Sequence, residues 1–205
     1  GGKKMDIVIG GKKPASRILV KENMTWANGM GRSCEFGYWS DAENKDIRLF
    51  DNVFAGKVQF KNWKTVEMRG NRFYAGIIGP VDPVKFPDNQ YGNPPTESVV
   101  FVRPNEYEPG RATITVYNWA GADTVSADIA RIVPVGALFE IRNAQNWHKG
   151  PVLKGVYNGK PVALPMTGLE PPQPIGAPGY ITSAEMTGKA FNVFVVESWA
   201  PGRRP

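Results

Sequence analysis

An internal repeat within the first 75 residues constrains the fold more than any other feature of this sequence. Residues 18–27, 47–56 and 66–75 align with one another, and each copy has alternating apolar residues ahead of an asparagine. A second pattern also recurs, because residues 35–39 (EFGYW) match residues 59–63 (QFKNW). One copy of the second pattern lies between successive copies of the first, so each period contains at least two strands.

The spacing of the repeated asparagines is typical of a solenoid. Asn23 and Asn52 are 29 residues apart, Asn52 and Asn71 are 19 apart, and the longer interval contains the polar insertion 40–45. One coil cannot bury its own apolar side chains, so coils stack with parallel strands about 4.8 Å apart and like residues lie over like. The three asparagines are expected to stack at a corner, because their side chains can hydrogen-bond along the stack and asparagine tolerates φ > 0. Two internal columns are expected, formed by Ile18, Ile47 and Val66 and by Val20, Leu49 and Met68.

With this repeat, residues ~5–79 resemble the final coils of right-handed parallel β-helix proteins, the pectate-lyase-like superfold, and residues 1–79 are assigned to such coils. The superfold contains polysaccharide lyases, glycoside hydrolases, phage tailspikes and non-catalytic surface proteins, so the resemblance does not by itself select a function. It also implies that upstream coils or another subunit cover the N-terminal end. Otherwise this end would expose unpaired strand edges and an apolar column.

The second half of the chain has a different pattern. Residues 77–95 contain five prolines, which remove backbone donors and interrupt strands, so residues 80–95 are expected to be a linker. Strand-like segments return at 99–102, 112–117, 124–129, 138–141, 152–156, 161–164 and 191–196. These segments, separated by turn residues, predict an immunoglobulin-like β-sandwich over residues 96–205. The predicted fold class is therefore all-β: the terminal coils of a right-handed parallel β-helix followed by this sandwich.

Net charge is unevenly divided along the chain. Residues 1–80 carry 14 Lys and Arg against 8 Asp and Glu, whereas residues 81–205 carry 11 of each. The positive part favours a polyanionic partner, which could be nucleic acid or acidic polysaccharide. RNP, KH, zinc-finger and helix-turn-helix signatures are missing from the sequence, so acidic polysaccharide is the favoured partner.

Location is inferred from the same sequence. No apolar run reaches the ~18 residues that would span a bilayer, and the first residues lack the apolar core of a signal peptide. If the protein is secreted to an extracellular or cell-surface location, its signal sequence lies outside this chain.

Few residues offer catalytic chemistry. The single histidine, His148, and the single cysteine, Cys34, lack the motifs of a hydrolase triad or a zinc site, so no metal ligands are assigned. Glu22 and Asp51 occupy equivalent repeat positions, and stacking would bring these carboxylates within roughly 5–7 Å of each other. This separation suits a glycosidase pair, and it would also suit an oxygen-rich Ca²⁺ site; no other cofactor is expected.

Aromatic and basic residues suggest glycan binding instead. Trp39 and Trp63 occupy equivalent positions of the second pattern, so they are expected to form a stacked external pair on which sugar rings could lie. Nearby Arg32, Lys61 and Lys64 would pair with acidic groups of the glycan. Tyr38 is expected to share a face with Phe36, since alternate residues of an unbroken strand point the same way.

Three functional hypotheses follow. The first is a non-catalytic extracellular polysaccharide-binding or cell-surface β-helix module that belongs to a larger protein. The second is the C-terminal portion of a polysaccharide lyase or glycoside hydrolase, for which Glu22 and Asp51 are the candidate catalytic residues. The third is a self-assembling structural surface or tailspike-like subunit. The compositional pattern favours the first hypothesis.

Overall fold

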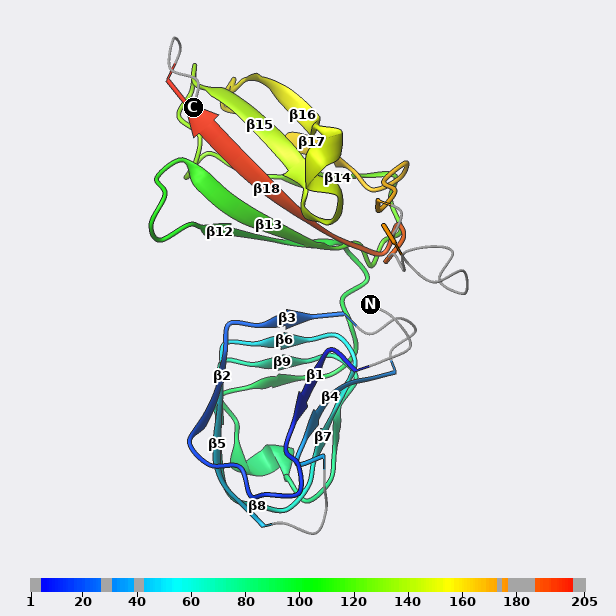
Figure 1. Ribbon diagram of the computed structural model, residues 1–205. Helices are drawn as coiled ribbons and strands as arrows, with labels where there is room; N and C mark the ends of the chain where they lie inside the picture. Colours follow the sequence, from blue (N-terminus) through cyan, green and yellow to red (C-terminus); the bar gives the residue numbers. More distant parts are fainter. Residues whose placement is uncertain (1–4, 27–30, 39–42, 173–174, 177–186, 201–205) are drawn as a thin grey trace. The chain divides into compact units, whose positions relative to one another are not determined.

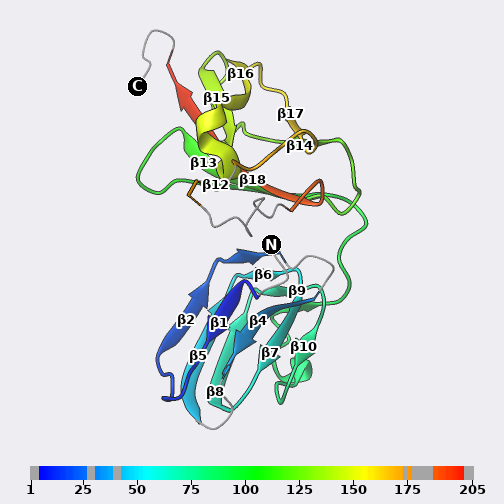
Figure 2. The same cartoon turned by 45° about the vertical axis from the view of Figure 1, so that its right-hand side comes forward.

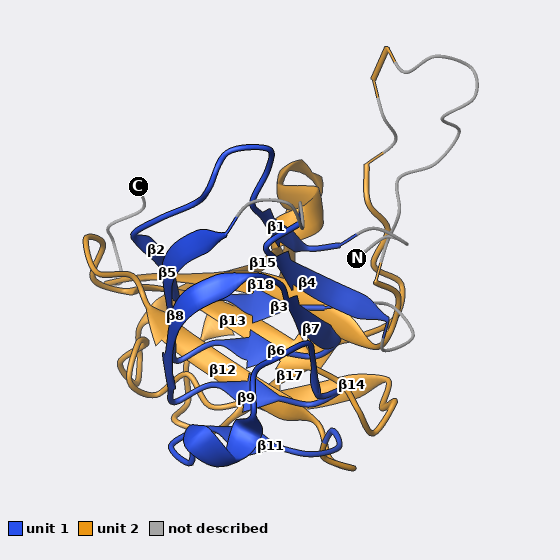
Figure 3. Ribbon diagram, turned by 90° about the horizontal axis from the view of Figure 1, so that it is seen from below, with its two compact units in different colours: residues 1–94 blue, residues 95–205 orange. Residues whose placement is uncertain are grey.

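The computed structural model describes residues 5–26, 31–38, 43–172, 175–176 and 187–200. The chain divides into two compact units, Gly1–Pro94 and Pro95–Pro205 (Figure 3). The described residues are mainly strand, and the first unit is built from parallel sheets whereas the second is antiparallel. The predicted fold class, β-helix coils followed by a sandwich, is therefore confirmed.

Three parallel sheets form the walls of the first unit (Figures 1 and 2). Sheet 1 contains β1 (Ile7–Ile9), β4 (Arg32–Phe36), β7 (Lys57–Phe60) and β10 (Ile77–Ile78). Sheet 2 contains β2 (Ile18–Lys21), β5 (Asn44–Phe50) and β8 (Trp63–Arg69). Sheet 3 contains β3 (Met24–Thr25), β6 (Val53–Phe54), β9 (Arg72–Phe73) and β11 (Gln90–Tyr91). The chain visits the three sheets in turn, so each circuit is one coil of a solenoid.

Register within these sheets confirms both predicted internal columns. Ile18 pairs with Ile47 and Ile47 with Val66, while Val20 pairs with Leu49 and Leu49 with Met68. Aromatic rings form a third column, in which Phe54 stacks on Phe73 with ring centroids 5.2 Å apart, and Phe73 stacks on Tyr91 at 5.4 Å. These columns are in contact inside one buried core cluster. Because sheet 2 keeps one register through its three strands, the repeat of its residues can be recognised in the sequence.

The fourth coil uses residues that the sequence places in the linker. After β10 the chain forms a short 3-10 helix, Pro83–Lys85, where the earlier coils have a strand of sheet 2, and then β11 pairs in parallel with β9. Asp82 caps this helix by accepting the Val84 N–H at 3.1 Å, and Pro83 suits the first turn because its missing N–H needs no partner there. The solenoid thus continues through Tyr91, and the prolines replace only one strand of its last coil.

An asparagine ladder joins all four coils at the corner between sheets 2 and 3. The Nδ2 of Asn23 donates to Oδ1 of Asn52 at 3.0 Å, Asn52 donates to Asn71 at 2.8 Å, and Asn71 donates to Asn89 at 2.7 Å. The predicted stacking of the first three asparagines is confirmed. Asn89 is a fourth member, which the sequence hides among the prolines of the last coil.

Positive φ at this corner falls one residue before each of the first three asparagines, rather than on the asparagine as the sequence suggested. Glu22, Asp51 and Gly70 have φ of 57°, 56° and 66°. Each of these three turns therefore has one left-handed residue followed by an asparagine whose amide donates along the stack.

The second unit is an antiparallel sandwich. Its five-stranded sheet has the order β12 (Val99–Pro104), β13 (Arg111–Tyr117), β18 (Phe191–Trp199), β15 (Leu138–Asn143) and β16 (Pro151–Val156). Its two-stranded sheet pairs β14 (Thr124–Ala127) with β17 (Val162–Pro165), and a 3-10 segment, η3, spans Ala144–Lys149. Each segment that the sequence identified as a strand in this half overlaps one of these strands.

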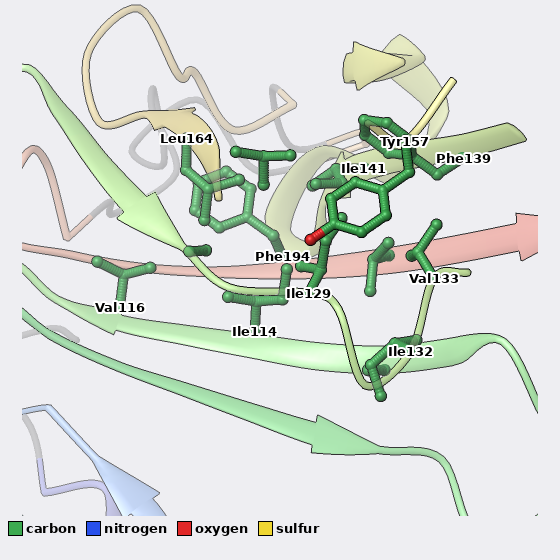
Figure 4. Packing of buried hydrophobic residues seen from close by; sticks show 14 of the residues in the cluster. Ile114, Val116, Ile129, Ile132, Val133, Phe139, Ile141, Tyr157, Leu164 and Phe194 are labelled. Carbon is green, nitrogen blue, oxygen red and sulfur yellow. The ribbon is translucent and has the colours of Figure 1, made fainter. Parts of the chain in front are cut away.

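Side chains from both sheets fill the core of the sandwich (Figure 4). Ile114 and Phe194 come from the larger sheet and Leu164 from the smaller, and all three are fully buried. Tyr157 also points into this core, where its hydroxyl has no hydrogen-bond partner. Burial of the phenol raises the pKa of Tyr157 above its usual value.

Candidate functional site

The corner between sheets 1 and 2 gathers basic side chains from three successive coils. The first coil turns there through residues 10–17, Tyr38 follows β4 in the second coil, and Lys61 and Asn62 make a two-residue turn in the third. We call this region the basic corner, and its cationic residues are Lys12, Lys13, Arg17, Lys45, Lys61 and Lys64. All of them are exposed except Lys61, which is half-buried. Like charges crowded in this way attract a polyanion and repel one another without it.

Hydrogen bonds between coils hold the backbone of the basic corner in place. Asn44, which is buried, accepts the Ala15 N–H on its Oδ1 at 2.9 Å. The Lys45 N–H donates to the carbonyl of Ala15 at 2.8 Å, and the Asn44 N–H donates to the carbonyl of Asn62 at 2.7 Å. These bonds tie the three turns together, so the attached lysines lie on a preformed scaffold.

Gly37 is required where the second coil enters this corner. Its φ is 93°, and a Cβ built on it would lie 2.0 Å from the Lys61 carbonyl oxygen. The same bend breaks the alternation of β4. As a result Phe36 is 0 % exposed while Tyr38 is 46 % exposed, and the expectation that they share a face is wrong. Tyr38 therefore presents an aromatic ring at the basic corner.

Carboxylates neutralise only part of this cluster. Lys61 forms an ion pair with Glu35, in which it donates to Oε1 at 2.6 Å; Asp46 instead accepts the backbone N–H of Arg17 at 3.0 Å. Within the described ranges, Lys13, Lys45 and Lys64 form no ion pair. These three ammonium groups can therefore meet an incoming anion without first breaking a salt bridge.

Two of the predicted binding residues meet at one carboxylate. Glu35 is only 2 % exposed, and it holds Arg32 through a 3.2 Å contact as well as Lys61. Arg32 also donates to the side-chain oxygen of Gln59 in the next coil. Arg32 and Lys61 thus neutralise a buried carboxylate on sheet 1. Lys64 lies on β8 of sheet 2 and forms no ion pair among the described residues.

The predicted tryptophan pair is only partly described. Trp63 is half-buried and packs against the core cluster of the solenoid, and its indole Nε1 is buried without a hydrogen-bond partner. It pairs in register with Asn44, whose side chain accepts the Ala15 N–H at the turn. Trp39 lies outside the described residues.

Glu22 and Asp51 lie at the other end of sheet 2, where they make the left-handed corner described above. Glu22 forms an ion pair with Lys21 at 2.7 Å, and both side chains are half-exposed. The Asp51 carboxylate lies over Gly70, where an added Cβ would be 2.1 Å from Oδ1. Their equivalent spacing is accounted for by the turn geometry. In the part of the chain that the structure describes, no group of three or more His, Cys, Asp and Glu side chains could hold a metal ion.

The single cysteine and the single histidine lie in different units. Cys34 is fully buried inside the solenoid, and burial raises the pKa of its thiol to about 12. His148 is exposed on η3 of the second unit.

None of the described helices has the length and apolar character needed to cross a membrane.

Comparisons of the chain with protein-family models, with curated proteins and with solved structures found no match.

Proposed function

We propose that this chain is a non-catalytic, extracellular polysaccharide-binding module of the pectate-lyase-like β-helix superfold, and that it holds acidic chains at the basic corner. The observation that carries the proposal is the convergence of basic side chains from three consecutive coils on one preformed corner. Three of them, Lys13, Lys45 and Lys64, have no ion pair among the described residues. The exposed ring of Tyr38 supports a saccharide in preference to another polyanion, because a flat aromatic face can stack on a sugar ring.

The repeat of the scaffold suits a repeating ligand. Successive coils are separated by about 4.8 Å, so the basic side chains of neighbouring coils start from backbone positions a short distance apart along the solenoid axis. Lysine ammonium groups are flexible point charges, which tolerate variation in the position of each carboxylate or sulfate. Exposed charges are screened over about 8 Å at physiological salt, so binding should weaken as salt rises while the contribution of Tyr38 persists.

Affinity electrophoresis tests the proposal. Wild type and the double variant Lys45→Gln/Lys64→Gln are run through gels containing polygalacturonate, alginate or a neutral glucan. At roughly 0.5 kcal/mol for each exposed charge contact, losing both should weaken binding to the acidic polymers about fivefold. The matched control is Lys154→Gln/Lys160→Gln, which removes the same two charges from exposed positions of the second unit.

The outcomes separate the functional hypotheses. Equal retardation of wild type, variant and control in the acidic gels would refute binding at the basic corner. Shortening of the polymer with new absorbance from unsaturated ends would favour the lyase hypothesis instead. A shift that occurs only with nucleic acid would assign the positive surface to that partner.

A second candidate role is pairing with another coil, which the open strand edges of the first coil favour. Among the described residues, β1, β2 and β3 are each paired along one edge only, and no described donor reaches Oδ1 of Asn23. Every later Oδ1 of the ladder accepts two N–H groups from the coil before it. We therefore propose that a further parallel coil, from upstream sequence or another subunit, pairs with this edge. Sedimentation equilibrium over a concentration series tests the subunit case: association that Leu19→Pro does not reduce would refute it.

A further inference from the structure

The second unit contains a cavity of about 820 Å³ that the sequence did not suggest. It lies at one end of the sandwich, where the turn from β12 to β13, the segment 131–137 and the end of β18 meet. Its volume is within the range of sites that hold small ligands, which is about 300–1,000 Å³. The cavity belongs wholly to this unit and shares no residue with the basic corner.

Ser198 fixes the walls of this cavity. Its N–H donates to the Gly110 carbonyl at 2.8 Å, and its Oγ is 3.1 Å from the same oxygen and 3.4 Å from the Ile132 carbonyl. Gly110 has φ of 85°, and an added Cβ would lie 2.8 Å from Ser198 Oγ, so the turn can approach β18 only because residue 110 is glycine. The site is therefore preformed, and little ordering is needed when a ligand binds.

The lining combines flat apolar groups with one available cation. Trp199, Pro109 and Pro134 supply apolar surface. Arg111 also lines the cavity, but Glu108 holds it at 2.7 Å and Glu197 at 3.6 Å, so its charge is already balanced.

Arg131 differs from Arg111. It is exposed and lines the same cavity, and its guanidinium has no ion pair or hydrogen bond among the described residues. A carboxylate entering the cavity would find this cation unoccupied, and a guanidinium can hold a carboxylate through two parallel hydrogen bonds.

Polar groups at the rim can serve hydroxyl groups. Asn105 accepts the N–H groups of Tyr107 and Glu108 on its Oδ1 at 2.8 and 3.0 Å, which fixes the side chain and leaves its Nδ2 as a donor. The half-exposed carboxylate of Glu108 accepts from Arg111 and retains further lone pairs. A ligand with an apolar ring face, ring hydroxyls and one carboxylate would satisfy all of these groups.

We propose that the cavity binds one hexuronate unit of an acidic polysaccharide, with its ring against Trp199 and its carboxylate on Arg131. This inference deepens the proposed function and rests on it, since it gives the second unit a site for the same class of polymer. An aromatic carboxylate is the competing occupant, because it would use Trp199 and Arg131 but leave the polar rim unused.

Titration of the full chain with trigalacturonate tests the inference, followed through backbone amide chemical shifts. Shifts are expected at Gly110, Ile132 and Ser198, and Arg131→Gln should weaken binding at these sites about tenfold. Lys160→Gln removes one charge outside the cavity, so it should leave the titration unchanged. Maltotriose, which lacks the carboxylate, should bind at least tenfold more weakly than trigalacturonate.

Several results would overturn the inference. These are an absence of shifts around the cavity, equal affinity for maltotriose, an unchanged titration in Arg131→Gln, or tighter binding of benzoate at the same residues. Lys45→Gln/Lys64→Gln should keep the cavity shifts, while its binding to the acidic polymers in the gels weakens about fivefold. If that variant is retained more weakly than wild type and the wild-type cavity shows no shifts, the proposed function stands and this inference fails. If the cavity shows shifts and the variant is retained as strongly as wild type, binding at the basic corner fails and the cavity site stands.

Discussion

Replacing Asn52 by alanine should destabilise the solenoid far more than the same change at Asn23. Asn52 is 0 % exposed, and its Oδ1 accepts the backbone N–H of Asn23 at 2.9 Å and its Nδ2 at 3.0 Å. Its own Nδ2 donates to the Val20 carbonyl at 2.9 Å and to Oδ1 of Asn71 at 2.8 Å. Asn52→Ala therefore removes four hydrogen bonds from two neighbouring coils.

The loss of stability in Asn52→Ala depends on the polar groups that it leaves without a partner. The Asn23 N–H loses its partner, the Val20 carbonyl loses the amide donor, and Oδ1 of Asn71 still accepts the Asn52 N–H at 3.0 Å. A buried polar group left without a partner costs about 1–3 kcal/mol, so the total should be about 2–4 kcal/mol. Asn23 is half-buried and its side chain only donates, so Asn23→Ala should cost about 1 kcal/mol or less.

Urea unfolding followed by amide resonances of each unit measures this difference. Resonances of residues 44–73 should show a lower midpoint in Asn52→Ala, whereas those of residues 111–117 and 191–199 serve as an internal control and should keep the wild-type midpoint. If Asn23→Ala destabilised the solenoid as much as Asn52→Ala, the ladder would not be a cooperative element and the reasoning from its buried interior would be refuted.

Three other predictions concern the same chain. Gly37→Ala should lower the free energy of unfolding of the first unit by about 2–4 kcal/mol, because Cβ would collide with the Lys61 carbonyl at a positive φ; Gly11→Ala, with nothing near its Cβ, is the control in the same assay, and equal costs would contradict the argument. Cys34 should resist thiol reagents at neutral pH until the protein unfolds, and rapid labelling of the native state would contradict this. Burial raises the pKa of its thiol from 9.0 to about 12, so the stability that comes from burying the neutral thiol is present below about pH 9 and is lost as pH rises toward 12. Limited proteolysis should cut first within residues 92–98, since the boundary between the units lies at Pro94 and Pro95, and mass spectrometry should show two resistant fragments rather than progressive trimming.

The stacking of the solenoid could be predicted because parallel coils place like residues over one another, so the sequence repeats from coil to coil. Ile18, Ile47 and Val66 occupy one column only if the strands pair without a shift, and a shift of one residue would expose the whole column. The same rule failed for the fourth coil. There a 3-10 helix replaces the strand of sheet 2. Val84 and Phe86 precede Asn89 at the spacing at which Ile47 and Leu49 precede Asn52, but the neighbouring prolines assigned this copy to a linker.

The basic corner could be predicted only in part, and the reason is the unequal length of its turns. The first coil uses residues 10–17 to make the turn that the third coil makes with Lys61 and Asn62, so a sequence alignment does not match the residues of these turns with one another. Equivalent spacing instead drew attention to Glu22 and Asp51, which occupy the left-handed position of the corner in the first two coils. In a solenoid, strict repetition marks the positions that stacking requires, such as the asparagine ladder. Positions where the turns differ in length are not bound by that requirement, so their residues can vary from coil to coil.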